Sequence, residues 1–263
     1  MPSTHSAPPA PTPGRIGRVL SFRRTLAARA MVAGAVVRTE AGDRPLTDPE
    51  RERYLADAAA WRAARTLPEL GELTAAWLTG ANSYQPGYAA TGPDRETAEL
   101  LDVLAAVNRR GLVTISSQPG HAAARGVDGW LWTQHAAVTG FASEATARSI
   151  TGYLNVRGYG LNLRTWRPAA GGRARFSRSH AIEATVREHP ESGEEQVITV
   201  FGTFIPAGSL RALYGRELGR HGVAAVLGAW QITLAEFDHG PEEHNTRLWP
   251  MLAAWAEAEG SRP

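Results

Sequence analysis

Apolar residues recur at helical spacing along much of the chain, and helix start and stop signals bound these stretches. Asp48-Pro49, an N-cap followed by proline, begins a predicted helix that runs to about Arg65. A second predicted helix covers about 68–79 and stops at Gly80. The same pattern predicts helices at about 94–111, 143–158, 206–229 (broken near Gly219 or Gly222) and from Asn245 or Thr246 to beyond Trp255.

Short runs rich in β-branched and aromatic residues lie between these helices and predict strands. Their ranges are about 112–117, 136–141, 161–166, 180–188, 197–205 and 232–237. The fourth and fifth runs form a predicted hairpin closed by the polar turn 189–194, whereas 118–135 is predicted to be a Gly-rich loop. We therefore predict an α/β fold, with α+β as the alternative: a single mixed sheet of about six strands with helices packed on it.

The N-terminal part of the chain differs in composition from the rest. Its first fourteen residues are rich in Pro, Ala, Ser and Thr, and no acid precedes Glu40. We expect residues 1–44 to form a poorly ordered extension and residues 45–263 to form a single globular domain. No apolar run approaches the length of about 18 residues that a membrane helix needs, so we expect a cytoplasmic protein without a membrane partner.

The amino-acid composition excludes several kinds of chemistry. All 28 basic residues are arginine, and cysteine is absent. Without lysine there is no Schiff-base anchor for PLP and no Walker-type nucleotide site. Without cysteine there is no thiolate nucleophile and no Cys-ligated metal. The cofactor and the oligomeric state stay open.

Two Gln-Pro-Gly segments, at 85–88 and 118–121, are the most distinctive local motifs. Proline at the second position of a turn and glycine at the third predict a type II turn for each. The second segment follows a predicted strand, at the place where open α/β sheets bind ligands. We predict that the two segments face each other across a small polar pocket, with the alternative that they are only tight turns. The predicted ligand contacts are Gln85, Tyr88, Ser117 and Gln118.

Histidines near the second segment are candidate catalytic groups. His121 and His135 are candidates for a general base or a ligand contact. Hydrolytic chemistry would also draw on the serines at 116–117 and on Asp128, although no nucleophile-elbow pattern accompanies them. The loop 238–244 is rich in His and acids, but we interpret it as a solvated loop before a helix and predict no metal site.

A basic segment separates Glu144 from Glu183 without an intervening acid. Its arginines, with interleaved aromatic residues, can contact phosphates and stack on bases. The seven arginines are Arg148, Arg157, Arg164, Arg167, Arg173, Arg175 and Arg178. We predict that the last five bind nucleic acid or a phosphate-bearing small molecule. The alternative is a set of surface cations paired with acids elsewhere.

Several segments, in order along the chain, resemble a family of uncharacterised actinobacterial proteins known only as a domain of unknown function. They are Gln85-Pro86-Gly87-Tyr88, Pro93-Asp94 with Glu96-Thr97, Leu104-Ala105-Ala106 with Asn108-Arg109, Ser117-Gln118-Pro119-Gly120, the stretch 132–138 with Gly140-Phe141, and Leu248-Trp249-Pro250. The resemblance covers about residues 67–255 and implies no activity and no catalytic residues.

Three classes of function therefore stay open. The first is a binding protein for nucleic acid or a phosphate-bearing ligand, acting through residues 148–178, and it is the one we favour. The second is a small-molecule enzyme of hydrolase or transferase type that uses the loop site at 116–135. The third is a non-catalytic interaction or regulatory protein.

Overall fold

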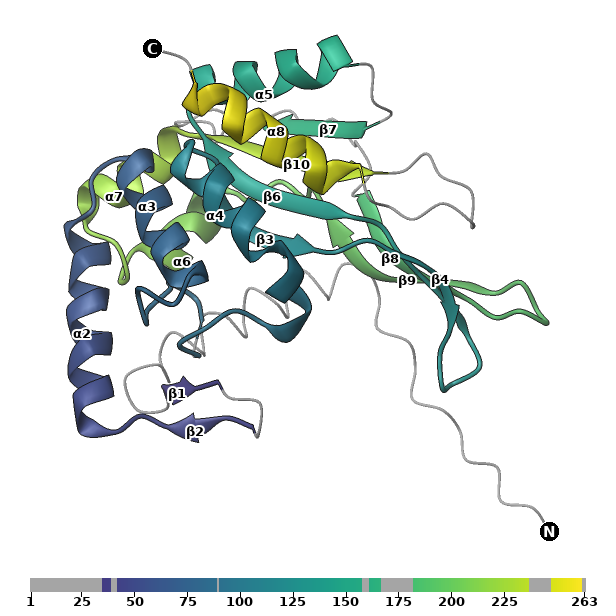
Figure 1. Ribbon diagram of the computed structural model, residues 1–263, viewed down its shortest axis with the longest axis horizontal. Coiled ribbons are helices and arrows are strands. Elements are labelled where there is room, and N and C mark those ends of the chain that lie inside the picture. Colours follow the sequence, from purple (N-terminus) through teal and green to yellow (C-terminus); the bar gives the residue numbers. More distant parts are fainter. Residues whose placement is uncertain are drawn as a thin grey trace.

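The computed structural model describes residues 35–38, 42–88, 90–157, 161–166, 182–236 and 247–261 (Figure 1). Its helices are α2 (Asp48–Ala63), α3 (Leu67–Leu78), α4 (Leu101–Arg109) preceded by the 3-10 helix η1 (Arg95–Leu100), α5 (Glu144–Arg157), α6 (Ala207–Tyr214), α7 (Arg220–Gly228) and α8 (Leu248–Gly260). Its strands are β1 (Val36–Val37), β2 (Arg44–Pro45), β3 (Val113–Gln118), β4 (His121–Arg125), β5 (Leu131–Gln134), β6 (Ala137–Ala142), β7 (Leu161–Trp166), β8 (Ile182–Glu188), β9 (Glu195–Phe201) and β10 (Trp230–Glu236).

The predicted helices are confirmed, including the break between α6 and α7, and so is the β8–β9 hairpin. Residues 1–34 lie outside the described residues, so the expected extension is described only from residue 35, where β1 and β2 pair. Within the described ranges no helix combines the length and the apolar character that a membrane span requires.

The strands form three antiparallel sheets, so the predicted single mixed sheet is wrong and the fold is α+β. The central sheet has the order β3-β6-β10-β7, the projecting sheet has the order β4-β5-β8-β9, and β1 pairs with β2. Strand β10 lies between β6 and β7 and is antiparallel to both. Strand β10, from far along the chain, therefore separates β6 from β7, which the single helix α5 connects in sequence.

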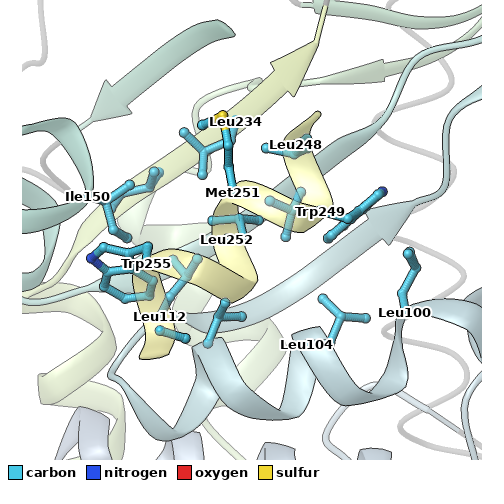
Figure 2. Packing of buried hydrophobic residues seen from close by; sticks show 14 of the residues in the cluster. Leu100, Leu104, Leu112, Ile150, Leu234, Leu248, Trp249, Met251, Leu252 and Trp255 are labelled. Carbon is cyan, nitrogen blue, oxygen red and sulfur yellow. The ribbon is translucent and has the colours of Figure 1, made fainter. Parts of the chain in front are cut away.

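Helices cover both faces of the central sheet, which explains why every residue of β6 is buried. On one face α4, α5 and α8 enclose a core that includes Leu104, Ile150 and Leu252 (Figure 2). On the other face residues from α2, α3, α6 and α7 pack with Val113 and Phe141, which are register partners in β3 and β6. Figure 1 shows α8 lying across β6 and β10.

The projecting sheet continues the central one along the same chain segments. Strand β3 leads into β4 through Pro119-Gly120, and β5 leads into β6 through His135-Ala136. The β4–β5 and β8–β9 hairpins extend away from the helices (Figure 1). The predicted loop at 118–135 is therefore wrong over β4 and β5. Their sequences, His-Ala-Ala-Ala-Arg and Leu-Trp-Thr-Gln, lack the apolar–polar alternation that marks a strand with one buried face.

Candidate functional site

The segment 85–88 forms the predicted type II turn. Gly87 has a φ of +86°, and the Tyr88 N–H donates to the Gln85 carbonyl oxygen at 3.0 Å. The turn is held against α2, because the indole Nε1 of Trp61 donates to the Tyr84 carbonyl oxygen at 2.9 Å. The first Gln-Pro-Gly segment is thus fixed to the helical layer.

The second Gln-Pro-Gly segment is not a type II turn. Gly120 lacks the positive φ that the third position of such a turn requires. The prediction is wrong here because Pro119-Gly120 passes the chain from one sheet to the next instead of folding it back. Ligand binding at carboxyl strand ends is a property of parallel sheets, and this sheet is antiparallel, so the position of the segment after a strand no longer favours a site there.

Gln118, the first residue of that segment, joins the two four-stranded sheets. Its amide nitrogen donates to the carbonyl oxygens of His135 and Ala184, at 2.8 and 3.0 Å. Its amide oxygen accepts from the hydroxyls of Thr185 and Thr199, at 3.3 and 3.2 Å. A glutamine side chain has two donor hydrogens and two acceptor positions. The buried amide of Gln118 is therefore fully used inside the protein.

A pocket of about 230 Å³ brings the first Gln-Pro-Gly turn together with β3. We call it the α3–β3 pocket. Its lining residues are Thr74, Trp77, Leu78, Gln85, Gly87, Tyr88, Pro93, Asp94, Thr97, Leu104, Thr114, Ile115, Ser116 and Ser117. Of the predicted ligand contacts, Gln85, Tyr88 and Ser117 thus line one pocket, whereas Gln118 makes its bonds toward β8 and β9.

A β-bulge in β3 decides which of the consecutive lining residues 114–117 share a face of the sheet. Thr114 lies opposite Gly140 of β6, but Ser116 lies opposite the very next partner, Thr139, so Ile115 is an extra residue. Directly paired residues point to the same face, and residues two apart on β6 share a face. Thr114 and Ser117, the partners of Gly140 and Val138, therefore face the same way. Without the extra residue these two side chains would face opposite ways.

Two polar atoms of lining residues are buried without a hydrogen-bond partner, namely Oε1 of Gln85 and Nε1 of Trp77. Their residues are 7% and 4% exposed. The Trp77 ring packs against the Tyr88 ring with centroids 4.8 Å apart. The hydroxyls of Ser116 and Ser117 also make no hydrogen bond within the described part of the chain. The two buried atoms have no accessible surface, so the polar groups that the pocket offers a ligand are hydroxyls beside its aromatic wall.

An ion pair stands at the rim of the pocket, where the exposed lining residue Asp94 binds Arg38. Arg38 is brought there by the stretch 35–38. The Thr91 N–H donates to the Val36 carbonyl oxygen at 3.0 Å, and Val36 forms a parallel bridge with Ala90. The pair neutralises the carboxylate of the lining.

Sequence reasoning missed Trp77, Asp94 and Thr97 as site residues. Trp77 has the spacing of a helix core position, and its ring is indeed buried. Asp94 follows proline just before a helix, where an acid is expected as a cap. Each residue type already had a structural explanation, so no pattern in the sequence indicated that these residues line a pocket.

The candidate catalytic histidines do not line the α3–β3 pocket. His121 is exposed and lies opposite Gln134 in the β4–β5 hairpin. His135 is half-buried between β5 and β6, and its backbone N–H donates to the Ala184 carbonyl oxygen at 2.7 Å. Their catalytic roles stay predictions, without support from proximity to Ser117.

The basic segment is described only in part. Arg148 in α5 pairs on the surface with Glu144, one turn earlier in the same helix, at 2.6 Å. Arg164 lies in the edge strand β7, opposite Thr233 of β10. Four predicted contacts lie outside the described residues, namely Arg167, Arg173, Arg175 and Arg178. Phosphate binding by this segment stays a prediction.

The loop 238–244 also lies outside the described residues. Among the residues that are described, no three His, Asp or Glu side chains gather in a way that would hold a metal ion.

The fold and the site together define an α+β protein with a small, partly aromatic pocket between a helical layer and a bulged strand. The chain belongs to the family described as Domain of unknown function (DUF6919), whose model matches residues 56–257. This match includes every lining residue of the pocket but not β1 or Arg38. No curated protein matches the chain in sequence.

Proposed function

We propose that this protein binds a small organic molecule in the α3–β3 pocket. The observation that carries the proposal is the pocket itself, a cavity of about 230 Å³ in which the packed rings of Trp77 and Tyr88 lie beside the hydroxyl-bearing residues Thr97 and Ser117. Ligand sites are typically concave and mostly apolar, with a few polar groups that fix the orientation of the ligand.

The chemistry of the lining supports binding over catalysis. Asp94 is the acid of the lining, and it is paired with Arg38. The described lining contains no histidine, and a serine nucleophile needs a base within hydrogen-bond reach. Ser116 and Ser117 are therefore better suited to hydrogen-bond a ligand than to attack one.

The size of the pocket limits the ligand. Its volume of about 230 Å³ is below the range of roughly 300–1,000 Å³ that is usual for drug-sized ligands. At roughly 30 Å³ for each water-sized group, it holds about eight such groups. The ligand is thus a small metabolite or one small moiety of a larger molecule.

A fragment screen by ligand-observed NMR tests the proposal. The wild type should bind several fragments, and Ser117→Phe, which fills the pocket, should lose them. Thr133→Phe in β5 is the matched control, because it adds the same bulk in the projecting sheet, outside the pocket. Absence of fragment binding to the wild type, or equal loss in both variants, would refute the proposal.

We also keep nucleic-acid or phosphate binding through residues 148–178 as a separate proposal, because seven arginines occur there without an acid. An electrophoretic shift assay with single-stranded DNA and RNA over a salt series tests it. Replacing Arg173, Arg175 and Arg178 by Gln should weaken binding and lower the salt slope by about 0.7 for each lost phosphate contact. The control is Arg148→Gln, since Arg148 is already paired with Glu144. Failure of the wild type to bind at low salt would exclude the proposal.

A further inference from the structure

We infer that Arg38 determines the charge selectivity of the α3–β3 pocket. Its ion pair with Asp94 makes the pocket prefer uncharged ligands, and without Arg38 the pocket accepts ligands that carry a cationic group such as a primary ammonium. This inference rests on the proposed function and specifies how the ligand is selected. It follows from the charge of the lining, from the exposure of Asp94 and from the way in which the chain holds Arg38 at the rim.

Asp94 carries the charge of the pocket lining. It is the one acid among the described lining residues, and neither arginine nor histidine is among them. The described lining by itself therefore bears one negative charge. The Asp94 side chain is 54% exposed, so its carboxylate is accessible to a ligand or a dissolved ion. Because opposite charges attract over several ångströms, the lining alone favours a cationic ligand.

Arg38 supplies a positive charge from outside the lining. Its guanidinium binds the Asp94 carboxylate, and its Nε has no accessible surface. The guanidinium is thus packed against the protein at the rim instead of extending into solvent. With this pair formed, the charge of the lining is neutralised, and a cationic ligand has to displace Arg38 before it can pair with Asp94.

Backbone contacts hold the chain beside Arg38 in place. The Val36 carbonyl oxygen accepts from the Thr91 N–H at 3.0 Å, and Val37 is the register partner of Arg44 in β2. Most exposed ion pairs contribute little, because two long side chains lose their freedom when they pair. Here the backbone that precedes Arg38 is already fixed on both sides of β1, so less freedom is lost.

The two charged residues come from different parts of the chain. Asp94 lies within the stretch 56–257 that matches the family model, whereas Arg38 precedes that stretch. The charge selectivity is therefore supplied from outside the matched domain. Replacing Arg38 changes this selectivity without changing any wall of the pocket.

Two probes of similar shape and different charge test the inference: benzylamine, which is cationic at neutral pH, and benzyl alcohol, which is uncharged. Their dissociation constants come from NMR chemical-shift titrations of the wild type and of Arg38→Gln. The wild type should bind benzyl alcohol at least as tightly as benzylamine. Arg38→Gln should shift the ratio of the two constants toward benzylamine by about three- to fivefold, the gain expected for one exposed ion pair.

Matched variants locate the effect. Arg44→Gln is the control, because Arg44 belongs to the same N-terminal stretch but pairs with Glu50 of α2 at 2.6 Å, and it should leave the ratio unchanged. In a protein that already carries Asp94→Asn, adding Arg38→Gln should no longer shift the ratio. Added salt should weaken benzylamine binding to Arg38→Gln more than to the wild type, since salt screens an exposed charge.

The outcomes separate this inference from the proposed function. An unchanged ratio in Arg38→Gln, an equal shift in Arg44→Gln, or a shift that persists without the Asp94 carboxylate would overturn the inference. So would failure of both probes to bind the wild type and Arg38→Gln. In each of these cases pocket ligands from the fragment screen would still support the proposed function. If no fragment binds the wild type at all, both the inference and the proposed function fail.

Discussion

The central and projecting sheets have four strands each and share one long hairpin, yet their surroundings differ. Every residue of β6 in the central sheet is buried, whereas every residue of β5, which precedes it along the chain, is only half-buried. Helices pack on both faces of the central sheet, and the projecting sheet extends away from them (Figure 1). The same long hairpin is therefore held by apolar packing in the central sheet and by polar and cation–π contacts in the projecting sheet.

Removing core volume from the helical cover should have the largest effect. Leu252 of α8 is 1% exposed within the core of the central sheet. We expect Leu252→Ala to lower the free energy of unfolding by about 2–5 kcal/mol through lost burial and a cavity. Leu131→Ala in β5 is the control, and it should cost about 1 kcal/mol or less. Urea denaturation measures both; equal losses would contradict the contrast between the sheets.

Removing the side-chain hydrogen bonds by which Gln118 connects the two sheets should have the next largest effect on stability. Gln118→Leu leaves the buried carbonyl oxygens of His135 and Ala184 without their side-chain donor, which we expect to cost about 2 kcal/mol. Hydrogen exchange should accelerate in β8 and β9 more than in β6. Fragment binding to the α3–β3 pocket should persist, because Gln118 does not line it. Loss of binding with normal exchange would instead assign Gln118 to the site.

Weakening the tip of the projecting sheet should have a smaller, local effect. The Arg187 guanidinium lies over the rings of Trp130 and Trp132, 4.5 and 5.3 Å from their centroids, and bonds to Asp128 at 3.1 Å. We expect Arg187→Ala to cost about 1 kcal/mol and to change tryptophan fluorescence from the tip. Arg125→Ala, whose side chain bonds only a carbonyl oxygen at 3.1 Å among the described contacts, is the control. A global loss of stability from Arg187→Ala would show that the tip of the projecting sheet is energetically coupled to the rest of the protein.

The smallest effect should come from replacing one buried acid, Glu217. Glu217, between α6 and α7, is 9% exposed, and burial raises the pKa of its carboxyl, partly offset by Arg62. Because the folded pKa lies above the ordinary value, the charged form opposes folding at neutral pH. Glu217→Gln should therefore raise Tm by about 1–3 °C at pH 7.

That gain should shrink as the pH falls toward 4.5, the ordinary value for glutamate, because the wild-type carboxyl is then protonated in the folded protein. Differential scanning fluorimetry over this range measures it, with the exposed Glu52→Gln as control. A gain that is independent of pH would disprove the assignment to Glu217.

Helical spacing and capping signals identified the helices because each buries one face, as α3 and α8 do. The same logic failed for β4 and β5, where no face is fully covered and the residue pattern carries little information. Sheet order could not be predicted, because the position of β10 between β6 and β7 depends on contacts between distant segments. Local sequence patterns indicate which residues are buried, but they do not indicate which strands pair.

The candidate site, like the fold, could be predicted from the sequence only in part. Gln85 and Tyr88 follow from a turn signal that the structure confirms, and Ser117 was predicted beside them. Gln118 was predicted as a ligand contact on the same grounds, yet its amide forms hydrogen bonds that connect the two four-stranded sheets. The difference lies in one strand position, since neighbours on a strand face opposite ways. The bulge that decides which residues face the pocket leaves no mark in the sequence.

The bulge at Ile115 makes the pocket depend on the length of β3 as well as on its composition. Deleting this one residue would restore an uninterrupted ladder with β6 and remove the local bend and extra twist that a bulge gives its strand. The sheet would keep its strands while the pocket lost one lining residue, Ile115. A change of one codon in length would thus reshape the binding surface during evolution without altering the fold.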